Sequence, residues 1–150
     1  MDLILWRHAD AEPGVPDLAR KLTAKGMKQA ERVGRWLNQQ LPDSAKILVS
    51  PADRAQQTAQ GLERKFKTVE ALSPSTSVAA VLAAVNWPHG NDTIVVVGHQ
   101  PVLGEIAALL VSGYEAEWPI KKGTLWWLTS RARESDADVA VRCVIGPDFV

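Results

Sequence analysis

The chain has 150 residues, of which 46% are hydrophobic and 23% charged, and these values predict one soluble globular domain spanning residues 1–150. Lysine plus arginine and aspartate plus glutamate both number 17, a balance that argues against a general nucleic-acid binder or a protein held on anionic membranes. Cys143 is the only cysteine, which excludes an intrachain disulfide and a thiolate zinc cluster, and no segment resembles a signal peptide or a membrane span. We therefore expect a cytoplasmic protein in which any anion site is local.

Two units of strand followed by helix are expected in the first half of the chain. The apolar run at 3–6 is typical of a strand buried on both faces, and prolines and glycine then predict a long loop. Thr23 and Ser50 stand where helix caps are expected, and Pro51 suits a first helical position. In chain order, we predict a strand at 2–6, a polar loop at 9–22, a helix from Thr23 to Leu41, a strand at 47–49 and a helix from Ser50 to about residue 67.

The second half continues the alternation and then changes character. Alternating strands and helices with short connections predict a mainly parallel sheet covered by helices on both faces, an α/β fold with three layers. The last two strands are expected to pair as an antiparallel hairpin, which would make the sheet mixed. The predicted elements are a helix at 76–86, a strand at 93–97, a helix from Val102 to Val111, and strands from Gly123 to Thr129 and from Val139 to Ile145, joined by a charged turn from Arg131 to Asp138.

Four basic side chains fall at or just beyond the ends of predicted parallel strands. Arg7 and His8 follow the first strand, Arg54 lies in the first helical turn after the second, and His99 follows the strand at 93–97. The carboxyl ends of parallel strands meet at one edge of an open sheet, where ligands bind. A single histidine or arginine is more often structural, but four at strand exits predict a common site. The exposed-loop residue His89 lacks this context and is expected to be solvated.

A phosphoryl group is the expected ligand of this site. A helix N-terminus already carries partial positive charge, so an arginine placed there, as Arg54 is, requires a compensating anion. Guanidinium groups bind phosphate oxygens in pairs, and an imidazole nitrogen can attack phosphorus in line. The alternative is a divalent metal held by the histidines with Asp10 or Glu12, but the neighbouring arginines would repel such an ion. We therefore expect no metal and no cofactor.

Taken together, these residues resemble the histidine phosphatase superfamily, also called phosphoglycerate mutase-like, and within it the small SixA-type protein-phosphohistidine phosphatases. The resemblance covers nearly the whole chain, and the order and spacing of its short motifs make it specific. It rests on Leu5-Trp6-Arg7-His8-Ala9-Asp10-Ala11, on Leu22-Thr23 with Gly26 and Gln29-Ala30, on Ser50-Pro51 with Arg54-Ala55 and Gln57-Thr58, and on Val97-Gly98-His99-Gln100-Pro101.

The resemblance implies a compact three-layer sandwich and a role for each site residue. It makes His8 the nucleophile that becomes transiently phosphorylated, and it makes Arg7, Arg54 and His99 the groups that hold the phosphoryl oxygens. Arg20 matches a basic position that SixA-type members use near the phosphate, and it is therefore a candidate substrate-binding residue.

Two departures from the family pattern bear on the substrate. The common Arg-His-Gly motif has Ala9 in its third position here, as it does in many SixA-like members. Larger relatives also supply a carboxylic acid in a Leu-x-Glu context, where this chain reads Leu72-Ser73-Pro74, with Glu70 out of register. A positioned acid contributes roughly 10²- to 10⁴-fold to the departure of an alkoxide, whereas the imidazole of phosphohistidine leaves as a neutral ring once its other nitrogen is protonated.

We therefore expect a phosphohydrolase that removes phosphate from phosphohistidine in a signalling or phosphotransfer protein. In the expected mechanism an unprotonated His8 nitrogen attacks phosphorus while its other nitrogen donates to a nearby carbonyl. One alternative is a phosphatase acting on small phosphomonoesters, with Asp10 or Glu12 as the acid. A further alternative is a phosphate-binding module without catalysis, and neither alternative involves nucleic acid or membrane.

Overall fold

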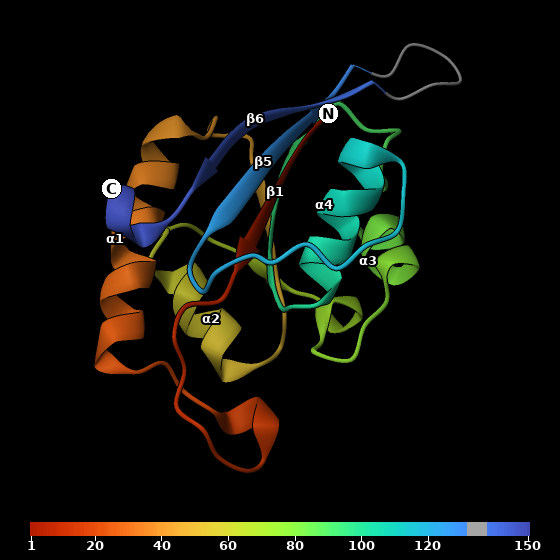
Figure 1. Ribbon diagram of the computed structural model, residues 1–150. Helices are drawn as coiled ribbons and strands as arrows, with labels where there is room; N and C mark the ends of the chain where they lie inside the picture. The colour runs from red at the N-terminus through yellow and green to blue at the C-terminus, as the bar shows by residue number, and fades with distance from the viewer. Residues whose placement is uncertain (132–137) are drawn as a thin grey trace.

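A six-stranded mixed sheet forms the centre of the computed structural model, which describes residues 1–131 and 138–150. The strands lie in the order β3-β2-β4-β1-β5-β6, and Figure 1 shows the last three of them, β1, β5 and β6, side by side. The first four in this order are parallel, and β5 and β6 continue the sheet as antiparallel neighbours of β1. Their bounds are β1 Asp2–Arg7, β2 Lys46–Val49, β3 Lys67–Thr68, β4 Thr93–Gly98, β5 Leu125–Ser130 and β6 Val139–Ile145.

Helices cover both faces of this sheet, so the α/β fold with a mostly parallel sheet and an antiparallel C-terminal pair is confirmed. Helices α1 and α2 cover one face, to the left of the sheet in Figure 1, and α3 and α4 cover the opposite face, to its right. Short 3₁₀ turns complete the chain. The first pair is α1 Ala24–Gln40 and α2 Asp53–Gln60, the second is α3 Val78–Ala84 and α4 Val102–Ser112, and the turns are η1 Asp17–Ala19, η2 Glu70–Leu72 and η3 Pro147–Phe149.

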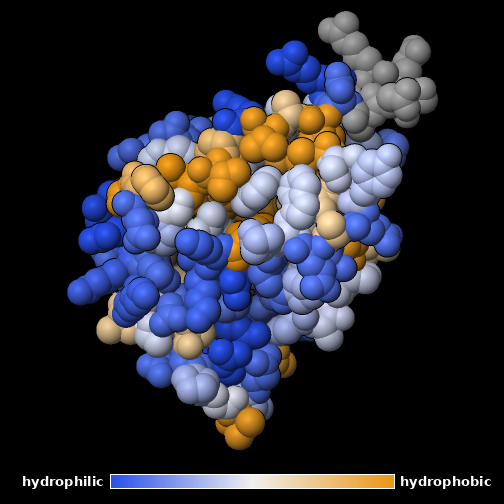
Figure 2. Space-filling model, in the orientation of Figure 1, coloured by the Kyte–Doolittle hydropathy of each residue, from blue (hydrophilic) through white to orange (hydrophobic). Residues whose placement is uncertain are grey.

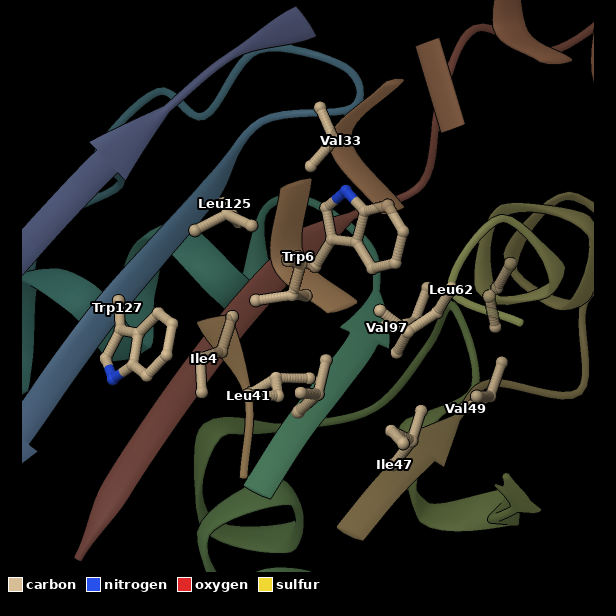
Figure 3. Packing of buried hydrophobic residues seen from close by; sticks show 14 residues of the cluster. Ile4, Trp6, Val33, Leu41, Ile47, Val49, Leu62, Val97, Leu125 and Trp127 are labelled. Atoms are coloured by element: carbon tan, nitrogen blue, oxygen red, sulfur yellow. The ribbon is translucent and has the colours of Figure 1, made fainter. Parts of the chain in front are cut away.

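Alternation along β1 divides the core between the two faces. Ile4 and Trp6 point toward α1 and α2, where they pack with Val33 and Leu62 (Figure 3). Leu3 and Leu5 point toward α3 and α4 and join a second buried cluster. Because β1 is buried on both faces, its end is held rigidly, and the residues that follow it start from a fixed position.

The two tryptophans of β5 follow the same alternation. Trp127 packs in the cluster under α1 and α2, and Trp126 packs on the opposite face against Trp118, with ring centroids 5.6 Å apart. The hairpin pairing of β5 with β6 is confirmed. The charged turn predicted from Arg131 to Asp138 lies, apart from its two end residues, outside the described residues.

The helix after β2 was predicted wrongly at both ends. Ala52 occupies the N-cap position of α2 and makes no side-chain capping bond, and Ser50 instead contacts His99. The helix ends at Gln60 rather than near residue 67, and Glu63 then adopts φ 54°, a left-handed conformation that cannot continue a helix. The short strand β3 begins where that helix was predicted to end, and the turn η2 occupies residues for which the sequence predicted no element.

Helix α1 begins where its sequence predicts. The Thr23 hydroxyl accepts a hydrogen bond from the backbone N–H of Gly26, which satisfies one of the free donors of the first turn. Further along, α1 approaches α2 so closely that a Cβ added to Gly34 would lie 2.3 Å from the carbonyl oxygen of Gly61. Across residues 1–131 and 138–150, no helix combines the length and hydrophobicity needed to cross a membrane.

Candidate active site

The ends of β1 and β4 lie side by side and bring the two predicted histidines together. Arg7 is in register with Gly98, and the backbone N–H of His8 donates to the carbonyl oxygen of Gly98 at 3.0 Å. The imidazole rings of His8 and His99 follow, with centroids 5.2 Å apart and an interplanar angle of 55°. Both side chains are buried, so their relative position is set by the sheet rather than by flexible loops.

Arg54 reaches the same region from the first turn of α2. Its side chain is buried, and both terminal nitrogens bind Asp17: Nη1 donates to the carbonyl oxygen at 2.8 Å and Nη2 to Oδ2 at 3.1 Å. Arg20 donates from Nη1 to the other carboxylate oxygen of Asp17 at 3.1 Å. The anion that sequence analysis required beside Arg54 is therefore supplied, at least in part, by the chain itself.

Asp17 was missed by the sequence analysis. It is the first residue of η1, in the loop that sequence analysis treated as irregular, and it bridges Arg54 and Arg20. These two arginines hold the pKa of Asp17 below its ordinary value through hydrogen bonds and charge. The three-residue spacing between Asp17 and Arg20 is a signal in the sequence for their ion pair. The sequence carries no such signal for the ion pair with Arg54, because that residue is brought to Asp17 by the fold.

Arg7 is the fourth predicted residue, and its guanidinium is oriented by the loop before β5. Nη1 donates to the carbonyl oxygen of Ile120 at 2.7 Å. The Nε atoms of Arg7 and Arg54 and the Nδ1 atom of His99 are buried and have no hydrogen-bond partner within the described residues. Buried polar atoms are rarely left unpaired, so these three are candidates to contact a ligand.

The surroundings of His8 favour a neutral imidazole with a defined tautomer. Nδ1 lies 2.7 Å from the carbonyl oxygen of Ala9, which only accepts, so Nδ1 carries the proton and Nε2 carries the lone pair. Burial lowers the pKa of His8 from 6.5 to about 4, and the charges of Arg54, Arg7 and Arg20 act in the same direction. The hydrogen bond to Ala9 opposes this shift. At neutral pH the ring is therefore unprotonated at Nε2.

His99 is held by a residue on the neighbouring strand end. Its Nε2 lies 2.7 Å from the hydroxyl oxygen of Ser50, which follows β2 and is fully buried. The pKa of His99 is lowered from 6.5 to about 3, mainly by burial and also by the nearby His8 and Arg54. His99 is therefore also neutral at physiological pH.

Hydrogen bonds from α2 tie the loop after His8 to the arginine-bearing helix turn. The Thr58 hydroxyl accepts from the backbone N–H of Ala9 at 3.0 Å and donates to the carbonyl oxygen of Arg54 at 2.7 Å. Gln57 accepts from the backbone N–H of Leu22 at 2.7 Å. The Gln57-Thr58 pair of the sequence motif therefore connects the two halves of the candidate site.

Asp10, an alternative acid or metal ligand in the sequence analysis, is already engaged. Its Oδ1 accepts from Lys122 Nζ at 2.9 Å and its Oδ2 from the Thr23 hydroxyl at 2.8 Å. These two hydrogen bonds lower its pKa, so the carboxylate carries no proton to donate near neutral pH. No cluster of three histidine, cysteine, aspartate or glutamate side chains suited to a metal ion occurs among residues 1–131 and 138–150.

A groove of about 690 Å³ adjoins the site on the side of β5 and β6. Arg7 lines it together with Lys25, Lys121, Lys122 and the indole of Trp126. Figure 2 shows a band of hydrophobic side chains above this region, along β6, where Val141 and Val144 are exposed. The groove therefore shares Arg7 with the candidate site, but neither His8 nor His99 lines it.

Comparison with known proteins places this arrangement in a family. The model of the histidine phosphatase superfamily (branch 1) matches residues 3–74. The phosphohistidine phosphatase SixA homolog of Haemophilus influenzae is 36% identical over 126 residues, which cover 73% of this chain and 77% of that protein. The chain therefore belongs to the histidine phosphatase superfamily, as its motifs predicted.

Further relatives place it near the SixA-type members. Phosphohistidine phosphatase SixA of Escherichia coli is 29% identical over 122 residues, covering 75% of this chain and 76% of that protein. A structure of the protein histidine phosphatase SixA complexed with tungstate has a TM-score of 0.83 at 23% identity and covers 99% of both chains. The fold is thus that of the SixA-type and phosphoglycerate mutase-like proteins over its full described length.

Proposed function

We propose that this protein is a phosphohydrolase that forms a phosphohistidine intermediate on His8 and acts on phosphohistidine in a signalling or phosphotransfer protein. The observation that supports it most is the tautomer of His8, in which the Ala9 carbonyl holds the proton on Nδ1 and leaves the Nε2 lone pair available for attack. The similarity to SixA-type phosphohistidine phosphatases supports the same substrate class.

The reaction proceeds in two displacements. In the first, Nε2 of His8 forms a bond to phosphorus as the bond between phosphorus and the substrate imidazole breaks. The departing nitrogen keeps the electron pair, and the ring leaves neutral because its other nitrogen is already protonated. In the second, water attacks phosphorus and gives up one proton to solvent as the bond between phosphorus and Nε2 of His8 breaks. Inorganic phosphate leaves, and the electron pair of the broken bond returns to Nε2.

Charge on the phosphoryl oxygens is neutralised by groups that surround the paired rings. Arg7 and Arg54 provide permanent positive charge, and each has a buried Nε atom available to donate. His99 provides Nδ1, and Arg20 adds charge close enough to lower the pKa of His8. Donors that are fixed before the reaction stabilise charge without reorganisation, which is the largest contribution in many phosphoryl transfers.

The carboxylates of the site support a phosphoramidate rather than a phosphomonoester. An ester needs a protonated acid near the leaving oxygen, but the pKa of Asp10 is lowered and both its oxygens accept hydrogen bonds. Asp17 is bound by two arginines, which also lower its pKa. Glu70, the residue nearest to the family's acid in sequence, is exposed on η2.

The loop at 9–22 provides an apolar surface that suits a protein substrate. Val15 is 95% exposed and Leu18 is 50% exposed, and they flank Asp17, which binds Arg54. Figure 2 shows hydrophobic atoms at the tip that this loop forms at the bottom of the molecule. Exposed apolar side chains beside a site are typical of surfaces that contact another protein.

The test is a turnover assay on three substrates: a histidine-phosphorylated phosphotransfer domain, an acyl phosphate and an aryl phosphate. We expect release of phosphate from the phosphohistidine protein, with a much lower rate on the aryl ester. The trapped enzyme should carry a phosphoryl group that is labile in acid and stable in base, and His8→Ala should abolish both. A strong preference for the aryl ester would instead favour the small phosphomonoesterase, and turnover of His8→Ala at the native rate would exclude the mechanism.

A further inference from the structure

The hydrogen-bond partners of the Ser50 hydroxyl leave one direction in which its hydrogen can point. Its oxygen accepts the backbone N–H of Ala52 at 3.2 Å and lies 2.7 Å from Nε2 of His99. Ser50 is fully buried, and these two contacts are the hydrogen bonds of its hydroxyl group within the described residues. A hydroxyl has a single hydrogen, and here the acceptor in reach of it is the His99 nitrogen.

The two tautomers of a neutral His99 differ in how they satisfy this group. If Nε2 carried the ring proton, it would donate to Ser50, and the hydroxyl hydrogen of Ser50 would be buried without an acceptor. If Nδ1 carries the proton, Ala52 donates to Ser50 and Ser50 donates to Nε2, so the hydroxyl is satisfied and the Nδ1–H of His99 is the one group of the three left without a partner among the described residues. The first tautomer leaves both the Ser50 O–H and the Nδ1 lone pair unpaired, whereas the second leaves only Nδ1–H, which a bound anion can accept. Because a buried unsatisfied donor costs about 1–3 kcal/mol, the second tautomer is favoured, and more so when an anion accepts from Nδ1.

We propose that Ser50 is a positioning residue that fixes His99 in the Nδ1-protonated tautomer, so that His99 donates a hydrogen bond to a phosphoryl oxygen at the proposed active site. This inference rests on the proposed function for the identity of the anion. Nδ1 of His99 is the buried ring nitrogen without a partner among the described residues. The tautomer therefore decides whether this atom presents a hydrogen or a lone pair to the anion.

The choice matters because His99 has no charge to contribute. Burial and the neighbouring His8, Arg54 and Arg7 lower the pKa of His99 to about 3, and Asp17 opposes this only partly. A neutral ring attracts an oxyanion through an N–H and repels it through a lone pair. Without the Ser50 hydroxyl, His99 would lose its preference for the tautomer that attracts the anion.

Ser50 can lose its hydroxyl without losing its place in the fold. Its backbone N–H donates to the carbonyl oxygen of Val97 at 3.0 Å, so the main chain is tied to β4, the strand that leads to His99. The side chain is also not a helix cap, since α2 begins after Ala52. A Ser50→Ala protein is therefore expected to fold. The substitution also removes the acceptor of the Ala52 N–H, so the part of its effect that acts through His99 is isolated by comparing it in wild-type and His99→Ala backgrounds.

The first measurement is the tautomer itself, by long-range ¹H–¹⁵N correlation spectra of the three histidine rings, assigned with His8→Gln and His89→Gln proteins. We expect the wild-type spectrum to show His99 with a protonated Nδ1 and an unprotonated Nε2. In Ser50→Ala we expect a mixture of tautomers. A protonated Nε2 in the wild-type protein would overturn the proposal, and this measurement requires no substrate.

The second measurement is the affinity for tungstate or inorganic phosphate by calorimetry. Loss of one hydrogen bond to a charged group is expected to weaken binding about tenfold or more in Ser50→Ala, and Ser50→Thr, which keeps a hydroxyl, should stay nearer to wild type. In a His99→Ala background, the same Ser50→Ala change should have little further effect. An equal loss in both backgrounds would mean that Ser50 acts through the backbone and not through His99, which would refute the proposal.

These outcomes are separable from the proposed function. A wild-type protein that binds tungstate with the expected tautomer but hydrolyses no phosphoryl substrate would remove the phosphohydrolase and leave the role of Ser50 in anion binding. A protein that hydrolyses phosphohistidine with His99 protonated on Nε2 would support the proposed function and refute the role of Ser50. Phosphohistidine turnover by Ser50→Ala should be measured at substrate concentrations below and above KM. We expect KM to rise relative to wild type, with a smaller change in kcat.

Discussion

The wild-type protein is expected to lose unfolding free energy when the pH falls from about 7 to about 5, and replacing His8 by glutamine is expected to halve this loss. Burial lowers the pKa of His8 to about 4 and that of His99 to about 3, while the unfolded chain keeps the ordinary value of 6.5. Below about pH 6.5 the unfolded chain therefore binds protons that the folded protein excludes, and the free energy of unfolding falls by about 1.4 kcal/mol per pH unit for each ring. Both folded values lie below pH 5, so each ring accounts for a loss of about 2 kcal/mol there.

The measurement is urea unfolding followed by tryptophan fluorescence at both pH values, in buffer without phosphate, because a bound anion would stabilise the folded state. We expect the wild-type protein to lose about 4 kcal/mol and His8→Gln about 2 kcal/mol. The aspartates with lowered pKa lose their contribution only at lower pH. His89→Gln, at an exposed position, is the control and should behave as wild type. Equal losses in wild type and His8→Gln would refute the reasoning that the buried ring stays neutral.

Three further substitutions test individual contacts. Arg54→Lys keeps the charge but loses the paired donors, so kcat/KM on a phosphohistidine protein should fall about 100-fold or more; a loss under tenfold would contradict this. Asp17→Asn removes the carboxylate charge that binds Arg54 Nη2 and Arg20 Nη1, while Arg54 Nη1 keeps its bond to the main-chain carbonyl. Because Asp17 is half-exposed, we expect a change in unfolding free energy below about 1 kcal/mol, and because both arginines lose a contact that orients them, we expect a higher KM. A fall in kcat alone would argue against a role in binding. Gly34→Ala places a Cβ 2.3 Å from the Gly61 carbonyl oxygen, so chemical denaturation should show a loss of about 3 kcal/mol, and unchanged stability would show that α1 and α2 shift freely.

The parts of the site that the sequence predicted are those fixed by the sheet. His8 and His99 each follow an apolar run, and the carboxyl ends of neighbouring parallel strands must share an edge. Their proximity therefore follows from the fold class alone. The roles of these residues in catalysis stay predictions.

The contacts that the sequence did not predict depend on residues brought together only by the complete fold. Ser50 stands before a proline and an aspartate, a pattern typical of a helix cap. In the structure its hydroxyl instead forms a hydrogen bond with His99, which lies 49 positions further along the chain. The early end of α2 has the same kind of cause. Arg64 donates to carbonyl oxygens of Asn38 and Leu41 at the end of α1, and no periodicity within the segment itself encodes this contact.

The position of β1 in the centre of the sheet has a consequence for how the protein is made. Its two hydrogen-bonded neighbours are β4, which begins at Thr93, and β5, which begins at Leu125. As the ribosome elongates the chain, β1, which leads to the proposed nucleophile His8, must remain unpaired until most of the polypeptide has emerged. Such distant pairing slows folding and exposes an apolar segment meanwhile. The nascent strand therefore needs protection from aggregation until β4 and β5 have been synthesised.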